Sequence, residues 1–132
     1  MIRFLLDTNI CIFFMKGKYR LDKKIEEVKP ENCLISEITL AELKFGVEHS
    51  EMKEKNRKVL ATFLEGISIL PIFSSLDIYA KEKSRLRKMG MTINDFDLLI
   101  GATSITHGLI MVTNNTDEFK RIEGIELIDW TR

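Results

Sequence analysis

The run Ile2-Arg3-Phe4-Leu5-Leu6-Asp7-Thr8-Asn9-Ile10 decides the fold class of this chain. Its first half is a short apolar segment, typical of a buried β-strand, and it ends at an acid, Asp7. The residues that follow have the spacing of a helix that begins at Thr8. In an open parallel sheet, side chains at the carboxyl ends of the strands line the active site. Asp7 is therefore a candidate site residue, although helix capping accounts equally well for an Asp at this position.

The same succession of apolar run and helical segment continues along the chain. Further strands are expected at residues 33–35, 67–70, 109–112 and 126–129. Helices are expected at residues 8–15, 20–29, 37–49, 51–65, 75–89 and 94–107. Strands that alternate with helices and are apolar on both faces indicate a parallel sheet that is covered on each side. The sequence therefore predicts an α/β fold with a central parallel sheet of about five strands flanked by helices.

The length and composition of the chain exclude several classes of protein. Its 132 residues predict a single domain spanning residues 1–132, and its 45% hydrophobic content excludes a disordered chain. No apolar run approaches the roughly 18 residues of a membrane span, and the first residues lack the pattern of a signal peptide. We therefore expect a cytoplasmic protein with no membrane partner. Cys11 and Cys33 form no metal-ligand motif and are expected to be buried free thiols.

The charges balance to zero but are unevenly placed. Basic residues gather in two stretches, residues 16–24 and residues 81–88. One interpretation is a pair of solvated helix faces. The other is two basic flanks around an acidic centre, the arrangement that a protein cutting phosphodiesters would need.

Glu42 stands on an apolar face of a predicted helix. The turn of about 100° per residue places it between Ile38 and Phe45, and the opposite stripe of that helix is also apolar. We therefore expect a largely buried helix in which Glu42 has no easy route to water. A buried acid is costly unless it is paired, hydrogen-bonded or bound to metal. Glu42 is thus a candidate metal ligand, with an ion pair to a buried Arg or Lys as the alternative.

Asp97 presents the same conflict on a later helix. Its face continues to Gly101 and Ser104, which are small, so another segment or a ligand can come close to it. Asp95 projects from roughly the opposite side and, near the helix start, is expected to be a cap. The spacing therefore favours Asp97 over Asp95 as a site residue.

Asp7, Glu42 and Asp97 come from three separate segments with no matching basic partners. Oxygen ligands without His or Cys favour Mg²⁺ or Mn²⁺ over Zn²⁺. Such a metal lowers the pKa of a bound water and offsets charge on the in-line transition state of phosphodiester cleavage. The residues therefore predict a metal-dependent phosphodiesterase.

Several short motifs occur along the chain in a characteristic order. They are Leu6-Asp7-Thr8-Asn9, then Ser36-x-x-Thr39-x-x-Glu42-Leu43-x-x-Gly46, then Asp97-Leu98-Leu99-Ile100-x-Ala102, and last Thr113-Asn114-Asn115 with Glu118-Phe119. The ending Ile122-x-Gly124-Ile125-x-x-x-x-Trp130 completes the series. In this order and at these intervals, the motifs resemble the PIN-domain family, and within it the VapC-type toxin ribonucleases of type II toxin–antitoxin pairs.

The resemblance implies both a fold and an activity. It implies a PIN-like fold and an endoribonuclease that depends on Mg²⁺ or Mn²⁺ and acts as a toxin. The family's three central acids fall on Asp7, Glu42 and Asp97. The most similar subgroup cuts the anticodon stem-loop of initiator tRNA, and the family leaves a 5′-phosphate and a 3′-hydroxyl. A small VapB-like antitoxin is the implied protein partner, and we also expect a homodimer.

The supporting polar residues depart from the family pattern at one position. The family often carries a fourth acid after the fourth strand, where this chain has Thr113-Asn114-Asn115. Asp117 and Glu118 are the candidate substitutes. Thr113, Asn115 and Glu118 are expected to orient ligands or water beside the metal. The sequence leaves the number of metal ions open.

Two other functions compete with this one. A phosphatase of the haloacid dehalogenase type also has a strand that ends in Asp, but it needs a second Asp where this chain has Asn9. The alternative from another class is a catalytically silent PIN-fold module that binds RNA or protein. The intact trio of acids argues against it, because a module without metal would gain stability by losing buried carboxylates.

The first helix carries more apolar residues than one buried face can use. They are Ile10, Ile12, Phe13, Phe14 and Met15. We expect an amphipathic antitoxin segment to land on this surface and to place an Arg or Lys among the carboxylates. Packing inside the core, or in a homodimer interface, is the alternative.

Overall fold

Five parallel strands form a single sheet in the computed structural model, which describes residues 1–132. The strands are β1 (Phe4–Leu6), β2 (Cys33–Ser36), β3 (Ser68–Leu70), β4 (Ile110–Val112) and β5 (Glu126–Ile128). Their order across the sheet is β3-β2-β1-β4-β5, and each neighbouring pair is parallel. The predicted α/β fold and its sheet are confirmed. Because β1 is the central strand, Asp7 leaves the sheet at the middle of its carboxyl edge.

Helices connect the strands and cover the sheet. They are α1 (Thr8–Met15), α2 (Leu21–Val28), α3 (Glu37–His49), α4 (Lys53–Glu65), α5 (Leu76–Lys88), α6 (Asp95–Thr106) and α7 (Thr116–Phe119), with 3₁₀ turns η1 (Pro30–Asn32) and η2 (Phe73–Ser75). All six predicted helices are present, with small differences at their ends. The short α7 and the two turns were not predicted, because three or four residues are too few to show a helical period. None of the helices has both the length and the apolar composition that crossing a bilayer would take.

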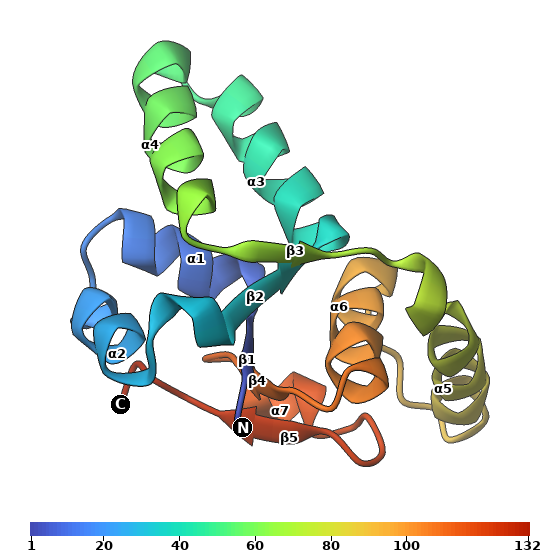
Figure 1. Cartoon of the computed structure of the whole chain (residues 1–132). Helices are drawn as coiled ribbons and strands as arrows, with labels where there is room; N and C mark the ends of the chain where they lie inside the picture. The colour runs from blue at the N-terminus through green and yellow to red at the C-terminus, as the bar shows by residue number, and fades with distance from the viewer.

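Successive side chains of the central strands pack into two separate hydrophobic cores, one on each face of the sheet. Leu6 and Val112 point into a core built with α1, α2, α3 and α4, whereas Leu5 and Met111 point into a core built with α5 and α6. Figure 1 shows α1 and α2 on one side of the sheet and α5 and α6 on the other. Because helices cover both faces, β1 and β4 are apolar at every position, as is typical of a buried parallel sheet.

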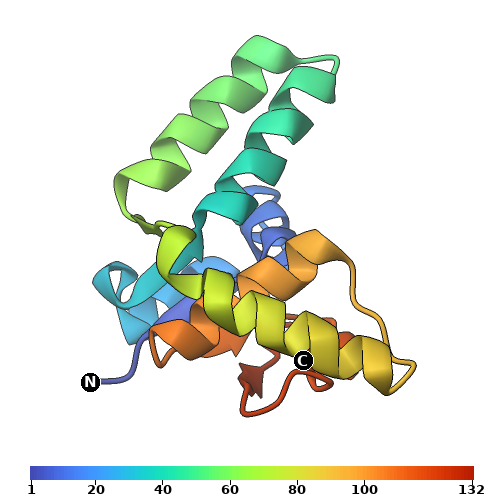
Figure 2. The same ribbon diagram turned by 90° about the vertical axis from the view of Figure 1, so that its right-hand side faces the viewer.

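The α3–α4 hairpin projects beyond the rest of the molecule (Figures 1 and 2). Only Thr39 and Leu43 of α3 are buried, so the expected largely buried helix is wrong. The reason is length: the 13 residues of α3 span about 20 Å, whereas the four residues of β2 before it span about 13 Å. The outer half of α3 therefore has no sheet to cover.

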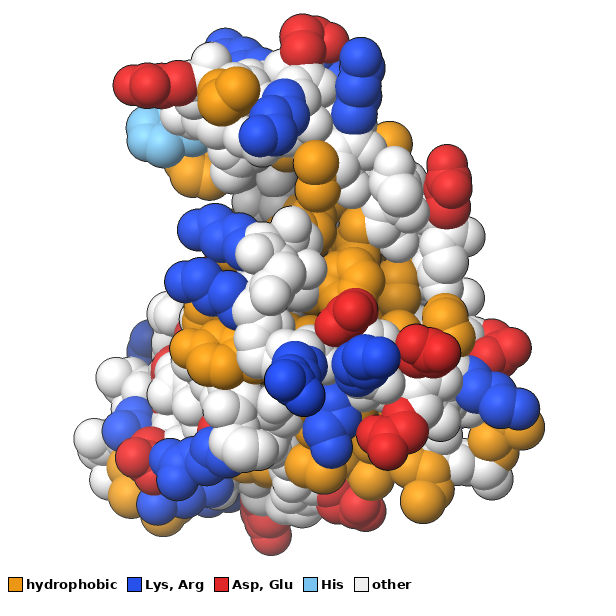
Figure 3. Space-filling view, turned by 90° about the vertical axis from the view of Figure 1, so that its left-hand side faces the viewer, with side chains coloured by type: hydrophobic (Ala, Val, Ile, Leu, Met, Phe, Trp, Pro, Cys, Tyr) orange, Lys and Arg blue, Asp and Glu red, His pale blue; other side chains and the backbone are white.

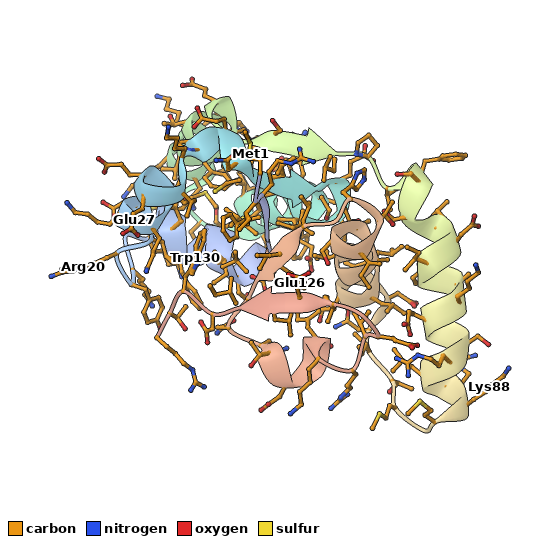
Figure 4. The ribbon with its side chains drawn as sticks, turned by 60° about the horizontal axis from the view of Figure 1, so that its bottom comes forward. Met1, Arg20, Glu27, Lys88, Glu126 and Trp130 are labelled. Atoms are coloured by element: carbon orange, nitrogen blue, oxygen red, sulfur yellow. The ribbon has the colours of Figure 1, made fainter.

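The chain end and the two cysteines complete the α1–α4 core. Trp130, beyond β5, lies on the α1 side of the molecule (Figure 4), where its ring centroid is 5.1 Å from that of Phe4. Cys11 and Cys33 are buried free thiols, as predicted. Burial raises the pKa of Cys11 well above its usual range and that of Cys33 to about 11, so both remain neutral packing groups.

Candidate active site

Asp7 is held at the end of β1 by three hydrogen bonds. Its backbone N–H donates to the carbonyl of Val112 at 3.1 Å, which ties it to β4. One carboxylate oxygen caps α1 by accepting the backbone N–H of Ile10 at 2.9 Å. The other oxygen accepts the hydroxyl of Thr113, at the end of β4. Capping and a site role are therefore compatible, because only one oxygen is used by the cap.

The environment of Asp7 disfavours its charge. The residue is only 4% exposed, and this burial is the main reason why its pKa rises from 3.8 to about 6. The hydrogen bonds from Thr113 and Ile10 lower the pKa, while the carboxylates of Asp97 and Glu42 raise it. None of these three acids forms an ion pair with a Lys or Arg. The three carboxylates therefore face one another without a neutralising cation from the chain.

Glu42 reaches the site from the second turn of α3. Ser36 ends β2 and caps this helix by accepting the backbone N–H of Thr39 at 3.1 Å. Glu42 accepts the hydroxyl of Thr8 at 2.6 Å, and the same hydroxyl oxygen lies 3.2 Å from that of Thr39. Glu42 is half-buried, so the expectation that it has no route to water is wrong, and so is the alternative of a buried ion pair. A hydroxyl, rather than a cation, is its partner.

Asp97 lies in the first turn of α6, where Asn94 forms two hydrogen bonds with it. The side chain of Asn94 accepts the backbone N–H of Asp97 at 3.0 Å and donates to its carboxylate at 2.8 Å. Asn94 is thus the cap of α6, and the prediction that Asp95 is a cap is wrong. Asp95 is exposed and instead accepts from Lys83 and from Tyr79, both at 2.8 Å. These bonds lower the pKa of Asp95 and join its carboxylate to α5.

The small residues on the Asp97 face let a later segment approach α6. A Cβ added at Gly101 would lie 2.4 Å from the Cδ1 of Ile122. The predicted close approach is therefore present, and its occupant is protein. This contact holds the region of α7 against α6.

The polar residues after β4 form a chain of hydrogen bonds that begins at Asp7. Thr113 accepts the backbone N–H of Asn115 at 2.9 Å, and the Asn115 amide donates to Glu118. Partial burial raises the pKa of Glu118, and the charge of Asp97 raises it further. Asp117 is instead exposed and pairs with Lys120. Of the two candidate substitutes for the fourth acid, Glu118 is the one that lies beside a site carboxylate, that of Asp97.

The donor set fits a divalent metal in its chemistry, because all four acids offer hard oxygen ligands and none has an ion-paired cation. No three of these side chains already form a ligand cage. Asp7, Glu42 and Asp97 instead turn toward Thr113, Thr8 and Asn94, respectively.

The two basic stretches differ in their distance from the acids. Lys16 lines the same groove as Glu42, between α1 and the α3–α4 hairpin. In the other stretch, Lys83 pairs with Asp95 and Arg85 pairs with Glu82. Two of the basic residues in the second stretch are therefore ion-paired on the surface of α5, whereas Lys16 of the first stretch lines the groove beside Glu42.

Thr8 and Asn94, the hydrogen-bond partners of Glu42 and Asp97, were not predicted from the sequence. Asn94 had a usable signal, because Asn three residues before an acid is the pattern of a capped helix start. Thr8 had none beyond its place next to Asp7. Its partner Glu42 is 34 residues away, and only folding brings them together.

Known proteins share both the sequence and the fold of this chain. The family described as the PIN domain matches residues 4–125. The chain is 36% identical over 132 residues to the tRNA(fMet)-specific endonuclease VapC of Shigella flexneri, covering 99% of this chain and 100% of that protein. It is also 36% identical to Ribonuclease VapC2 of Rickettsia felis, with 98% of each covered.

Solved structures agree with these relatives. DNA-bound VapBC from Salmonella typhimurium has a chain with a TM-score of 0.91 and 32% identity, covering 98% of this chain and 99% of that chain. VapBC2 from Rickettsia felis, bound to a fragment of promoter DNA, gives a TM-score of 0.91 at 34% identity, with 98% and 99% covered. The resemblance in the motifs and the expected ribonuclease class are confirmed. The chain therefore belongs to the PIN-domain family and, within it, to the VapC toxin ribonucleases.

Proposed function

We propose that this chain holds Mg²⁺ with Asp7, Glu42 and Asp97 and uses it to cleave RNA. The observation that carries the proposal is electrostatic: the carboxylates of Asp97 and Glu42 lie close enough to Asp7 to raise its pKa, and none of the three acids has an ion-paired cation. A divalent cation would offset this charge, and oxygen ligands select Mg²⁺ or Mn²⁺. Mn²⁺ is the second candidate because it accepts the same ligands.

The residues around the acids would orient them. Thr113 and the Ile10 amide fix Asp7, Thr8 fixes Glu42, and Asn94 fixes Asp97. Asn115 holds Glu118 beside Asp97. There the Glu118 carboxylate can accept a proton, or a hydrogen bond from a water molecule. When bound, the metal supplies the positive charge that offsets the transition state of phosphodiester cleavage. The expected products are a 5′-phosphate and a 3′-hydroxyl.

The proposed substrate is initiator tRNA. The support is the name tRNA(fMet)-specific endonuclease, carried by the Shigella flexneri relative at 36% identity and the Salmonella typhimurium relative at 34%. Both alignments span almost the full length of this chain. We place the cut in the anticodon stem-loop, since single-stranded loops expose the phosphodiesters that a groove of this kind can reach.

The proposed protein partner is a VapB-like antitoxin. The support is that similar solved structures are VapBC complexes, from Salmonella typhimurium, Rickettsia felis and Haemophilus influenzae. An apolar groove of about 520 Å³ includes Phe14, Val59 and Phe63. A second groove of about 610 Å³ shares Val59 and Met15 with the first and reaches Glu42.

Figure 3 shows hydrophobic side chains gathered on this face, beside the hollow below the α3–α4 hairpin. We infer that an amphipathic antitoxin helix lies there and brings a basic side chain to the acids. Ile10 is not part of this surface, because it is fully buried, whereas Ile12, Phe13, Phe14 and Met15 are half-buried. The homodimer stays a prediction, and sedimentation of the purified chain tests it.

One cleavage assay tests the proposed function. Purified protein is mixed with initiator tRNA or with elongator methionine tRNA, in Mg²⁺, Mn²⁺ or EDTA. We expect cleavage of the initiator tRNA with metal and none in EDTA. Asp7→Asn and Asp97→Asn should abolish cleavage, while Asp117→Asn, which changes an exposed acid, should not. Undiminished cleavage by Asp97→Asn would show that Asp97 is not a site residue. If wild-type protein binds RNA but cleaves it in neither Mg²⁺ nor Mn²⁺, the result would favour the catalytically silent binding module.

A further inference from the structure

The outer half of α3 carries an aromatic pair that neither core uses. Phe45 is 67% exposed, and its ring stacks on the imidazole of His49, with ring centroids 5.4 Å apart and planes inclined by 12°. Phe45 does not pack against either hydrophobic core. An exposed apolar ring is stabilised when a ligand covers it, because apolar surface is then removed from water. The pair therefore presents a flat aromatic face to solvent.

The pair is continuous with the candidate active site. Glu42, Phe45 and His49 are spaced by three and four residues, so they share one side of α3. Ile38, one turn before Glu42 on this side, packs on the core that contains Leu98 of α6. The same side of α3 is therefore turned toward the helix that carries Asp97. Phe45 and His49 lie about 4.5 and 10 Å beyond Glu42 along the helix axis, in the second half of α3. That half belongs to the hairpin that projects from the molecule in Figure 2.

We propose that Phe45, backed by His49, is a stacking platform for an unpaired base of the RNA substrate next to the cleaved phosphodiester. This inference rests on the proposed function, because that function places the phosphodiester at the acids. Proteins that bind single-stranded RNA stack its bases on aromatic side chains, and every base offers a π face. The chain belongs to a family of ribonucleases, and a flat exposed ring one helical turn from Glu42 is placed to stack on a base of a bound RNA. Phe45 thus contributes to substrate affinity rather than to the chemical step.

Binding and kinetics test the platform separately from the chemistry. In an Asp97→Asn background, which is expected to bind without cutting, affinity for a labelled anticodon stem-loop is measured by fluorescence anisotropy. Phe45→Ala should weaken binding by about 5- to 100-fold, the range of one lost base stack. Phe45→Tyr should bind as the parent does, because it keeps a ring, and Phe45→Leu should be as weak as Phe45→Ala. In the active protein, Phe45→Ala should raise KM and leave kcat nearly unchanged.

Matched controls separate stacking from other losses. Met52 is 58% exposed and apolar but lies at the far end of the hairpin, so Met52→Ala should bind RNA normally. Equal binding by Phe45→Ala and its parent would overturn the proposal, and so would full binding by Phe45→Leu. A change in sedimentation of Phe45→Ala would also overturn it, because the ring would then contact a second copy of the chain. If wild-type protein cuts no RNA in any metal, the proposed function itself fails, whatever the affinity of the Phe45 variants.

Discussion

Asp7 combines burial with a charge that the folded chain does not neutralise. Its pKa is raised from 3.8 to about 6, chiefly by burial, so the folded state binds a proton more tightly than the unfolded state. The stability that this proton contributes is fully present below about pH 4 and is lost as the pH rises through about 6. Without metal, ionised Asp7 therefore destabilises the protein at neutral pH.

Replacing Asp7 by Asn should reverse this penalty. In EDTA at pH 7.5, we expect Asp7→Asn to be more stable than wild type by up to about 3 kcal/mol, the equivalent of the raised pKa. The difference should shrink as the pH falls to 4, where wild-type Asp7 is protonated. Urea unfolding at both pH values measures it, with Asp117→Asn as the exposed control. A wild type as stable as Asp7→Asn at pH 7.5 would mean that the carboxylate is solvated in the folded state.

Asp95 and Asp97 should respond differently although they are two residues apart. Asp95 pairs with Lys83 at the surface, whereas Asp97 is held by Asn94 beside Glu118. We expect Asp95→Ala to cleave RNA at nearly the wild-type rate per folded molecule. A parallel measurement on Asp97→Asn should show no cleavage. Equal losses in both variants would contradict the geometry described for the start of α6.

At the scale of elements, the contact between α6 and the segment after α7 holds Glu118 near Asp97. The contact needs Gly101, because a Cβ there would meet the buried Ile122. Gly101→Ala should therefore destabilise the protein by about 1–2 kcal/mol, since crowding exceeds the gain in helix propensity. Combining it with Ile122→Val, which removes the crowded methyl, should recover part of the loss.

Gly46 is the matched control for this element. It lies in α3 with open space around it, so Gly46→Ala should stabilise the protein by about 0.5–1 kcal/mol. Thermal unfolding of the isolated chain compares the two substitutions. If Gly101→Ala stabilises as much as Gly46→Ala does, Ile122 moves aside without cost and α7 is held by other contacts.

At the scale of the whole molecule, the acids come from the end of β1 and from α3, α6 and α7, so an ion among them would join both cores. A ligand that binds only the folded state stabilises it, by about 2.7 kcal/mol at 100 times its dissociation constant. We expect saturating Mg²⁺ to raise the melting temperature of wild type by about 5–10 °C. Asp7→Asn should lose this response, and sodium chloride of equal ionic strength should not produce it. An equal rise in Asp7→Asn would indicate a metal site elsewhere.

Much of the fold could be predicted because its signals are local. The alternation of apolar runs with helical segments specified the parallel sheet, and the position of each run specified where Asp7 and Thr113 leave it. The burial of Glu42 was predicted wrongly from the same kind of pattern. A helical wheel shows which residues share a face, but it does not show that α3 outruns the sheet.

The sequence by itself determined the fold class and the family and led to the prediction of the three acids, because strand and helix periods and the individual motifs lie within short stretches of chain. Only the tertiary structure decided which partners these acids have. Thr113 meets Asp7 across 106 residues, and Lys83 takes Asp95 away from its expected role as a cap. It also decided that Phe45 stands in water beside Glu42. The physical reason is that hydrogen bonding, burial and exposure depend on what packs against a residue, and those neighbours are remote in the chain.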